Sequence, residues 1–287
     1  MKRFVFAATA LGLFVLGGSV ACSPLKTFNA IAPKDPGSRQ AASGIAYGSN
    51  ERQKLDVYVP EGEGADRPVI VFFYGGSWNS GTRAGYDFVG RALASRGFVT
   101  VLPDYRLVPE VRYPGFVEDG ASAVRWAKAN AADYSGDPDR IVLVGHSAGA
   151  YIAAMLAVDE RWLGKDRDAV TGFVGLAGPY DFAPFDVPAS QEAFGRWPDV
   201  AETQPVTWAG PGDPPALLLT GAEDQTVKPR NSHALEAKLT RAGVVARVKE
   251  YPDIGHIDIL LALSRPLRGK ASVLDDVASF AEAPGEL

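Results

Sequence analysis

A serine between glycines stands near the middle of the sequence, at residues 145–149, GHSAG. The apolar run IVLV precedes it and the apolar segment AYIAAMLAV follows Ser147 closely, which predicts a buried strand, a sharp turn and a buried helix. Such a turn raises the serine hydroxyl clear of the sheet and places a helix N-terminus beneath any negative charge that forms there. We therefore expect Ser147 to be a nucleophile.

Three histidines are candidates for the general base that this serine needs. His146 is too close to Ser147 along the chain to turn its ring onto the hydroxyl, and His233 falls in a polar helix that is typical of a solvated surface. His256 lies in YPDIGHID, a loop after the last predicted strand, at the sheet edge where open parallel sheets bind ligands. We expect His256 to be the base.

The third member of such a triad is a carboxylate that orients the imidazole. Asp224 follows the predicted strand PALLLTG, and it gives the chain order serine, aspartate, histidine. Glu223, Asp253 and Asp258 are nearby competitors, but a carboxylate at a separate strand end is better placed to reach the far ring nitrogen. We expect Asp224 in this role.

A glycine-rich loop, YGGSW, follows the apolar strand RPVIVFF. Glycines let a backbone approach a substrate closely, so its N–H groups are suited to bind the oxyanion of a tetrahedral intermediate. We expect the N–H groups of Gly76 and Ser77, together with that of Ala148 at the helix start, to form this oxyanion hole.

These residues need a sheet to position them, and apolar runs alternate with helical patterns from Gly44 onward. Strands are predicted at 44–48, 54–60, 67–76, 99–105, 141–144, 170–178, 215–221 and 246–252. Helices are predicted at 86–95, 116–130, 231–241 and 272–281, besides the helix after Ser147. This alternation predicts an α/β fold, a mostly parallel sheet with helices on both faces.

A lid is predicted at residues 179–215, after the sixth strand, where eight of the 21 prolines make long helices unfavourable. Its aromatic residues include Phe182 and Trp208. With Tyr74 and Trp78 of the glycine loop, they are expected to line a substrate pocket, although aromatic residues are equally typical of a small core within the lid.

The N-terminal segment, residues 1–21, has two basic residues, an uncharged run and small residues at its end, as export signals do. It resembles the bacterial lipoprotein signal, in which the following cysteine, here Cys22, receives lipid. Ordinary secretion fits the same residues, so the protein is expected either lipid-anchored in the cell envelope or periplasmic or secreted. Residues 22–43 are polar and predict a tether with no core of its own.

Residues 44–287 suffice for one α/β domain. The net charge of −5 argues against a nucleic-acid partner, and the single cysteine excludes an intrachain disulfide. Oligomeric state is not determined by these features.

The serine pentapeptide, the loop YGGSW, the segment DYRL, Asp224 and His256 together resemble an α/β-hydrolase of the carboxylesterase kind. The nearest groups are the hormone-sensitive-lipase-like esterases and the bacterial feruloyl/acetylxylan esterase-like family. The resemblance implies the α/β-hydrolase fold and hydrolysis of short-chain or aryl esters of small molecules, without a metal or an organic cofactor. Those relatives carry a histidine where this chain has Tyr74, so the resemblance implies that the role of bracing the loop either passes to a phenol here or is lost.

Two other functions fit the same residues. The triad also hydrolyses amides, so an arylformamidase-like hydrolase is one alternative. The other is a binding protein of the same fold that retains the triad and turns over slowly.

Overall fold

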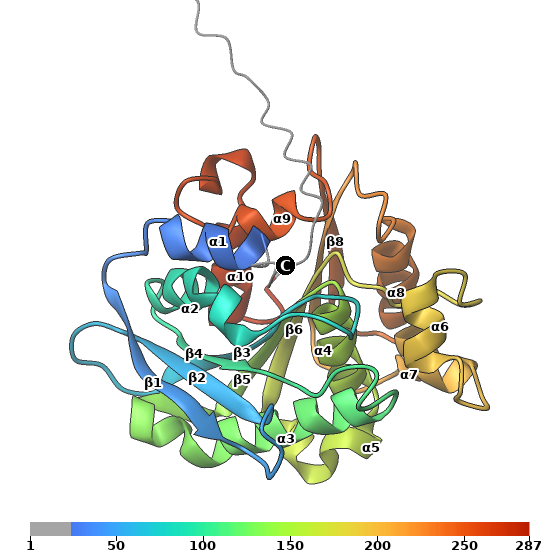
Figure 1. Ribbon diagram of the computed structural model, residues 1–287, viewed down its shortest axis with the longest axis horizontal. Helices are drawn as coiled ribbons and strands as arrows, with labels where there is room; N and C mark the ends of the chain where they lie inside the picture. The colour runs from blue at the N-terminus through green and yellow to red at the C-terminus, as the bar shows by residue number, and fades with distance from the viewer. Residues whose placement is uncertain (1–23, 287) are drawn as a thin grey trace, which may run out of the picture.

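The computed structural model describes residues 24–286, and within them eight strands form one sheet with helices on both faces (Figure 1). The strands are β1 (Ser38–Ala46), β2 (Lys54–Pro60), β3 (Arg67–Phe73), β4 (Val99–Pro103), β5 (Gly136–His146), β6 (Val170–Leu176), β7 (Ala216–Gly221) and β8 (Ala246–Tyr251). The α-helices are α1 (Pro24–Ile31), α2 (Asp87–Ala94), α3 (Gly115–Asn130), α4 (Ala148–Val158), α5 (Glu160–Leu163), α6 (Pro188–Phe194), α7 (Pro205–Trp208), α8 (Arg230–Arg241), α9 (Asp258–Leu261) and α10 (Val273–Glu282). Short 3-10 turns are η1 (Arg83–Gly85), η2 (Ala131–Tyr134), η3 (Gly164–Ala169), η4 (Ala201–Thr203) and η5 (Arg268–Lys270).

The strand order is β1-β2-β4-β3-β5-β6-β7-β8. β2 pairs antiparallel with β1 and β4, and all other neighbours pair parallel, which confirms the predicted mostly parallel sheet. β4 and β5 lie on opposite sides of β3, so the winding direction reverses there. A crevice opens at the carboxyl ends of strands at such a reversal.

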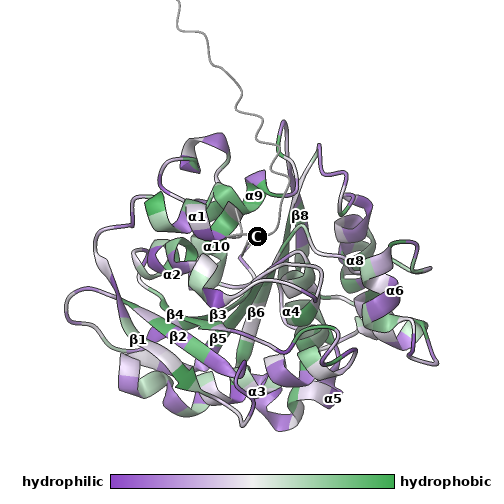
Figure 2. Cartoon of the chain, in the orientation of Figure 1, coloured by the Kyte–Doolittle hydropathy of each residue, from purple (hydrophilic) through white to green (hydrophobic). Residues whose placement is uncertain are grey.

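The core lies on both faces of the central strands. α2 and α10 cover one face, and α3, α4 and α8 cover the other (Figure 1). Every residue of α4 is buried, and five of its eleven residues are alanines, which allows close approach to β5 and β6. Figure 2 shows the same distribution: the central strands and α4 are hydrophobic, whereas the outer helices carry their polar residues outward.

The expected tether is wrong from Pro24 onward. α1 packs Leu25 and Phe28 against the core, and Phe28 meets the Phe88 ring edge-on at a centroid distance of 5.5 Å. The side chain of Asn29 donates to the Ala84 carbonyl and accepts the Phe88 N–H. A helix of eight residues has too few turns for its apolar face to stand out among polar neighbours.

The first strand also differs from its prediction at 44–48, because β1 begins at Ser38. β1 is an edge strand held by its pairing with β2, and most of its residues are not buried, so it lacks the apolar alternation that marks inner strands. The predicted export signal and Cys22 lie outside the described residues. Within residues 24–286, no helix has both the length and the apolar character needed to span a membrane.

The segment that follows β6 contains only short helices, α6, η4 and α7, none longer than seven residues. It lies beside α8, at the right-hand side of the molecule in Figure 1, and α7 also contacts α4. We refer to residues 179–215 as the lid.

Candidate active site

The turn between β5 and α4 holds Ser147 in a left-handed conformation, with φ 54° and ψ −123°. A side chain at Gly145 would place its Cβ 2.4 Å from the Gly149 carbonyl oxygen. At Gly149 the Cβ would lie 2.1 Å from the carbonyl oxygen of Phe73 in β3. Only glycine fits at either position, so the pattern of the pentapeptide follows from this close approach.

Ser147, His256 and Asp224 form one hydrogen-bonded chain. The Asp224 carboxylate can only accept, so His256 donates through Nδ1, at 2.7 Å from Asp224 Oδ2. His256 Nε2 is then the acceptor for the Ser147 hydroxyl, at 2.8 Å. The other carboxylate oxygen of Asp224 accepts the N–H groups of Thr226 and Val227, each at 2.8 Å. The structure therefore brings together the three residues that the sequence predicts.

The competing residues lie elsewhere. His233 is exposed on α8, near Glu236 and Glu250. Asp258 pairs with Lys270 at 2.6 Å, and this hydrogen bond holds its pKa below the usual range. Within residues 24–286, no three His, Cys, Asp or Glu side chains lie close enough together to bind a metal ion.

The loop after β3 turns sharply through Gly76, Ser77 and Trp78, whose φ angles are 130°, 51° and 59°. No hydrogen bond within the described residues is donated by the N–H of Gly76 or Ser77, and both residues line a cavity at Ser147. Ala148 is the first residue of α4 and lines the cavity on the lid side. The three expected oxyanion donors therefore surround Ser147.

Tyr74 does not line a substrate pocket, contrary to the prediction. Its ring is fully buried and stacks on Tyr86 and Tyr105, at centroid distances of 5.1 and 4.8 Å. Its hydroxyl donates to Asp104 Oδ1 at 2.7 Å and accepts from Arg52 at 2.9 Å. Burial raises the pKa of Tyr74, so the phenol stays neutral and braces the start of the glycine loop, which is one of the two alternatives that the resemblance leaves open.

Asp104 joins this phenol to the other side of the loop. Its carboxylate accepts the backbone N–H of Arg83 at 2.6 Å and pairs with the Arg83 guanidinium. The same guanidinium reaches Asp56 at 2.8 Å. A nearly buried ion network thus fixes the backbone on both sides of the glycine loop.

His146 makes a contact that the sequence does not reveal. It donates through Nε2 to the backbone carbonyl of His256 at 2.9 Å, and the two rings lie 4.9 Å apart. Its Nδ1 is buried without a hydrogen-bond partner among the described residues. Burial, and secondarily the nearby His256, lowers the pKa of His146 to about 3. A neutral His146 therefore holds the main chain of His256.

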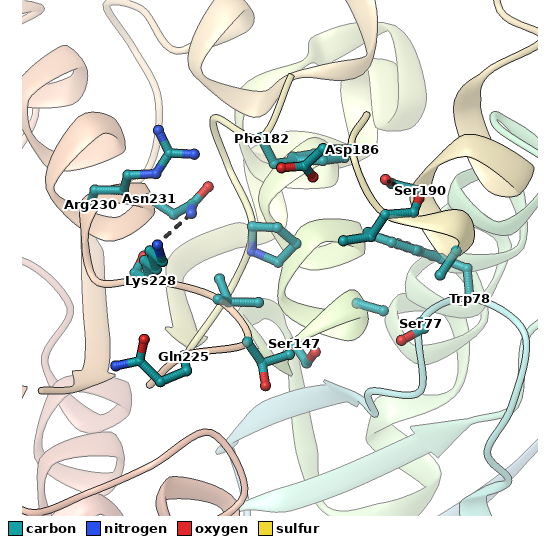
Figure 3. A pocket seen from close by; sticks show the side chains of 16 residues that line it. Ser77, Trp78, Ser147, Phe182, Asp186, Ser190, Gln225, Lys228, Arg230 and Asn231 are labelled. Carbon is teal, nitrogen blue, oxygen red and sulfur yellow. Dashed lines mark hydrogen bonds between the residues drawn. The ribbon is translucent and has the colours of Figure 1, made fainter. Parts of the chain in front are cut away.

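Two cavities meet at Ser147. One, of about 290 Å³, lies under the lid and is lined on that side by Phe182, with Trp78 facing it from the glycine loop (Figure 3). We call it the polar compartment. The other, of about 470 Å³, lies against α1 and α9, and we call it the apolar compartment.

The prediction that Trp208 lines the substrate pocket is also wrong. Trp208 lines neither compartment, because its indole N–H donates to the Glu202 carbonyl and its ring lies under the Arg161 guanidinium, 3.7 Å away. The aromatic residues of the lid serve both expected purposes. Phe182 lines the polar compartment and also packs on Phe194 in the core beneath the lid.

Comparison with known proteins matches residues 55–239 to the family described as BD-FAE. The chain is 28% identical over 271 residues to the isoprenylcysteine alpha-carbonyl methylesterase ICME of Arabidopsis thaliana, covering 86% of this chain and 63% of that protein. It spans 52 to 65% of the length of the plant methylesterases that it matches. It is 32% identical to the carboxylesterase NlhH of Mycobacterium tuberculosis, covering 75% of this chain and 74% of that protein.

Solved structures share the fold. A truncated carbohydrate esterase from gut microbiota superposes with a TM-score of 0.75 at 22% identity, covering 88% of this chain and 98% of that chain. Esterase 2 of Thermogutta terrifontis gives a TM-score of 0.70 at 22% identity, covering 89% of this chain and 97% of that chain. These similarities confirm the predicted α/β-hydrolase fold.

Replacing Asp104 by asparagine tests the ion network. The change removes the charge that faces Arg83 but keeps the shape, so we expect the free energy of unfolding to fall by about 3 kcal/mol in urea titrations. The exposed Asp139 offers the matched control Asp139→Asn, whose effect should stay within about 0.5 kcal/mol. Equal stabilities of the two variants would show that the network does not hold the loop.

Replacing His146 by glutamine tests its burial in the neutral form. Between about pH 6.5 and pH 3 the unfolded chain binds a proton at His146 that the folded protein does not, so stability falls as the pH drops. We expect the wild-type free energy of unfolding to fall more steeply than that of His146→Gln, by about 1.4 kcal/mol per pH unit between pH 6 and 4.5. The surface variant His233→Gln should follow the wild type. Parallel curves for all three proteins would contradict a neutral, buried His146.

Proposed function

Because the chain belongs to the BD-FAE family, we propose that it is a serine carboxylesterase that hydrolyses short-chain or aryl esters through an acyl-enzyme. The observation that carries this proposal is the hydrogen-bonded chain from Asp224 through His256 to Ser147 beside unengaged loop N–H groups. The similarity to the carboxylesterase NlhH of Mycobacterium tuberculosis supports the same class of reaction.

In the first half of the reaction Ser147 Oγ attacks the ester carbonyl carbon while His256 Nε2 takes the hydroxyl proton. The carbonyl oxygen becomes an oxyanion and accepts hydrogen bonds from the backbone N–H groups of Gly76, Ser77 and Ala148. Each such donor contributes about 10²- to 10³-fold in rate. Collapse of the intermediate breaks the bond to the alcohol oxygen, which receives the proton from His256.

In the second half a water molecule replaces the alcohol. His256 takes a proton from this water as its oxygen attacks the acyl carbon, and the same N–H groups bind the second oxyanion. Breaking the bond to Ser147 Oγ returns the proton to the serine and releases the carboxylic acid. Asp224 keeps the imidazole in the required tautomer and stabilises its protonated form during both halves.

Removing the nucleophile tests the proposal. We expect Ser147→Ala to lower the initial rate on 4-nitrophenyl acetate and butyrate by about 10⁶-fold while circular dichroism stays unchanged. Ser122→Ala, the same change at a site on α3, should keep wild-type rates. A Ser147→Ala enzyme that retains more than a few per cent of the rate would reject the nucleophile assignment.

The same assay separates the alternatives. Faster turnover of an aryl formamide than of any ester by the wild type would favour the amide hydrolase. Rates no higher than those of Ser147→Ala on every substrate would favour the binding protein.

We also propose that the chain is exported and that Cys22 carries lipid. The supporting features are the basic, uncharged and small-residue regions of residues 1–21 directly before this cysteine. Mass spectrometry of protein extracted from bacterial membranes should find an N-terminal Cys22 with diacylglyceryl mass added. A soluble protein that begins at an unmodified Cys22 would instead indicate ordinary secretion.

A further inference from the structure

The two compartments at Ser147 have opposite chemical character. The polar compartment is bordered by the cations Lys228 and Arg230 and, across from them, by Asp186 (Figure 3). The apolar compartment is walled by Leu25 and Phe28 of α1 and by hydrophobic residues of α9, and no Asp, Glu, Lys or Arg among the described residues lines it. An ester bound at Ser147 therefore meets a different environment on each side of its carbonyl carbon.

The cations of the polar compartment are available to a ligand. Within residues 24–286, neither Lys228 nor Arg230 forms an ion pair, and the carboxylate of Asp186 across the cavity forms none either. Two cations outnumber the one acid that borders this compartment. A negatively charged substituent placed there meets a favourable local field.

The position of His256 decides which half of the ester occupies which compartment. His256 must give its proton to the alcohol oxygen when the first intermediate collapses, so the alcohol lies on the side of its imidazole. His256 lines the apolar compartment and does not line the polar one. The acyl group extends away from the imidazole, past Ala148 and into the polar compartment under the lid.

We propose that the preferred substrate joins an apolar alcohol to an acid that carries a second carboxylate, so that it is the monoester of a dicarboxylic acid. This inference rests on the proposed esterase function and specifies its substrate class. The free carboxylate lies between Lys228 and Arg230, and the alcohol packs against Phe28 and Ile257.

A pair of isosteric substrates tests the acyl half. Benzyl hydrogen succinate and benzyl 4-methylpentanoate differ only at the end of the acyl chain. The succinate ends in a carboxylate, and the 4-methylpentanoate ends in an isopropyl group of similar size and shape. Chromatography of released benzyl alcohol should give about tenfold higher kcat/KM for the succinate, falling as salt is raised from 10 to 500 mM. The double variant Lys228→Gln/Arg230→Gln should lose this preference, by about 3- to 10-fold, with the neutral ester unaffected.

Lys238→Gln provides the matched control, because Lys238 is an exposed cation on α8 that does not line the compartment. It should keep the preference for succinate. Equal kcat/KM for the two esters in the wild type, or an equal loss in the control, would overturn the proposal.

The alcohol half is tested with benzyl and methyl hydrogen succinate. Phe28→Ala should lower kcat/KM about fivefold for the benzyl ester only, because the methyl group does not reach α1. Ile257→Ser repeats the test at a half-exposed side chain, whose replacement does not put folding at risk. The control is Ile31→Ala, because Ile31 also lies on α1 but is 76% exposed. An equal loss for the benzyl and methyl esters, or no loss for either in both variants, would overturn the assignment of the alcohol to the apolar compartment.

Failure of the esterase proposal gives a different result from failure of the substrate class alone. If the wild type hydrolyses neither the charged nor the neutral esters above the Ser147→Ala blank, the esterase proposal fails, and this inference with it. If the neutral esters are hydrolysed without preference for the carboxylate, the esterase proposal stands and only the substrate class is rejected.

Discussion

The contact between Gly149 of α4 and the Phe73 carbonyl of β3 is the constraint on which the site depends. A left-handed Ser147 costs about 1 to 3 kcal/mol, and only tight packing of α4 against the sheet maintains it. Phe73 is also the last residue before the glycine loop. One close approach therefore fixes Ser147 and the loop that carries the proposed oxyanion donors relative to each other, before any side chain contributes.

Buried polar groups determine the rest of the geometry. Asp224 fixes the tautomer of His256, His146 holds the main chain of His256, and the network around Asp104 holds the glycine loop. Each group is buried or nearly buried and bonded to residues distant in sequence, so each contact is strong in its low-dielectric surroundings. The arrangement of Ser147, His256 and the glycine loop is thus held from several directions by groups that do not line either compartment themselves or do so only in part.

The sheet and the triad could be predicted because both follow from short-range rules. Inner strands show as apolar runs, and strand ends of a parallel sheet meet at one edge, which placed Asp224 and His256 beside Ser147. α1 and the contacts of Tyr74 and His146 could not be predicted. A short helix has little periodicity, and a side chain whose partner lies 30 residues away, as Asp104 does from Tyr74, leaves no local pattern.

Among the residues that the structure describes, the two compartments share three of those that line them, Ser77, Ser147 and Thr226. Their other walls come from distant parts of the chain, the lid on one side and α1 with α9 on the other. Mutations that reshape one wall therefore leave the other nearly intact. Such a division lets the two halves of a substrate be selected separately during evolution, so one scaffold can change its acid while keeping its alcohol.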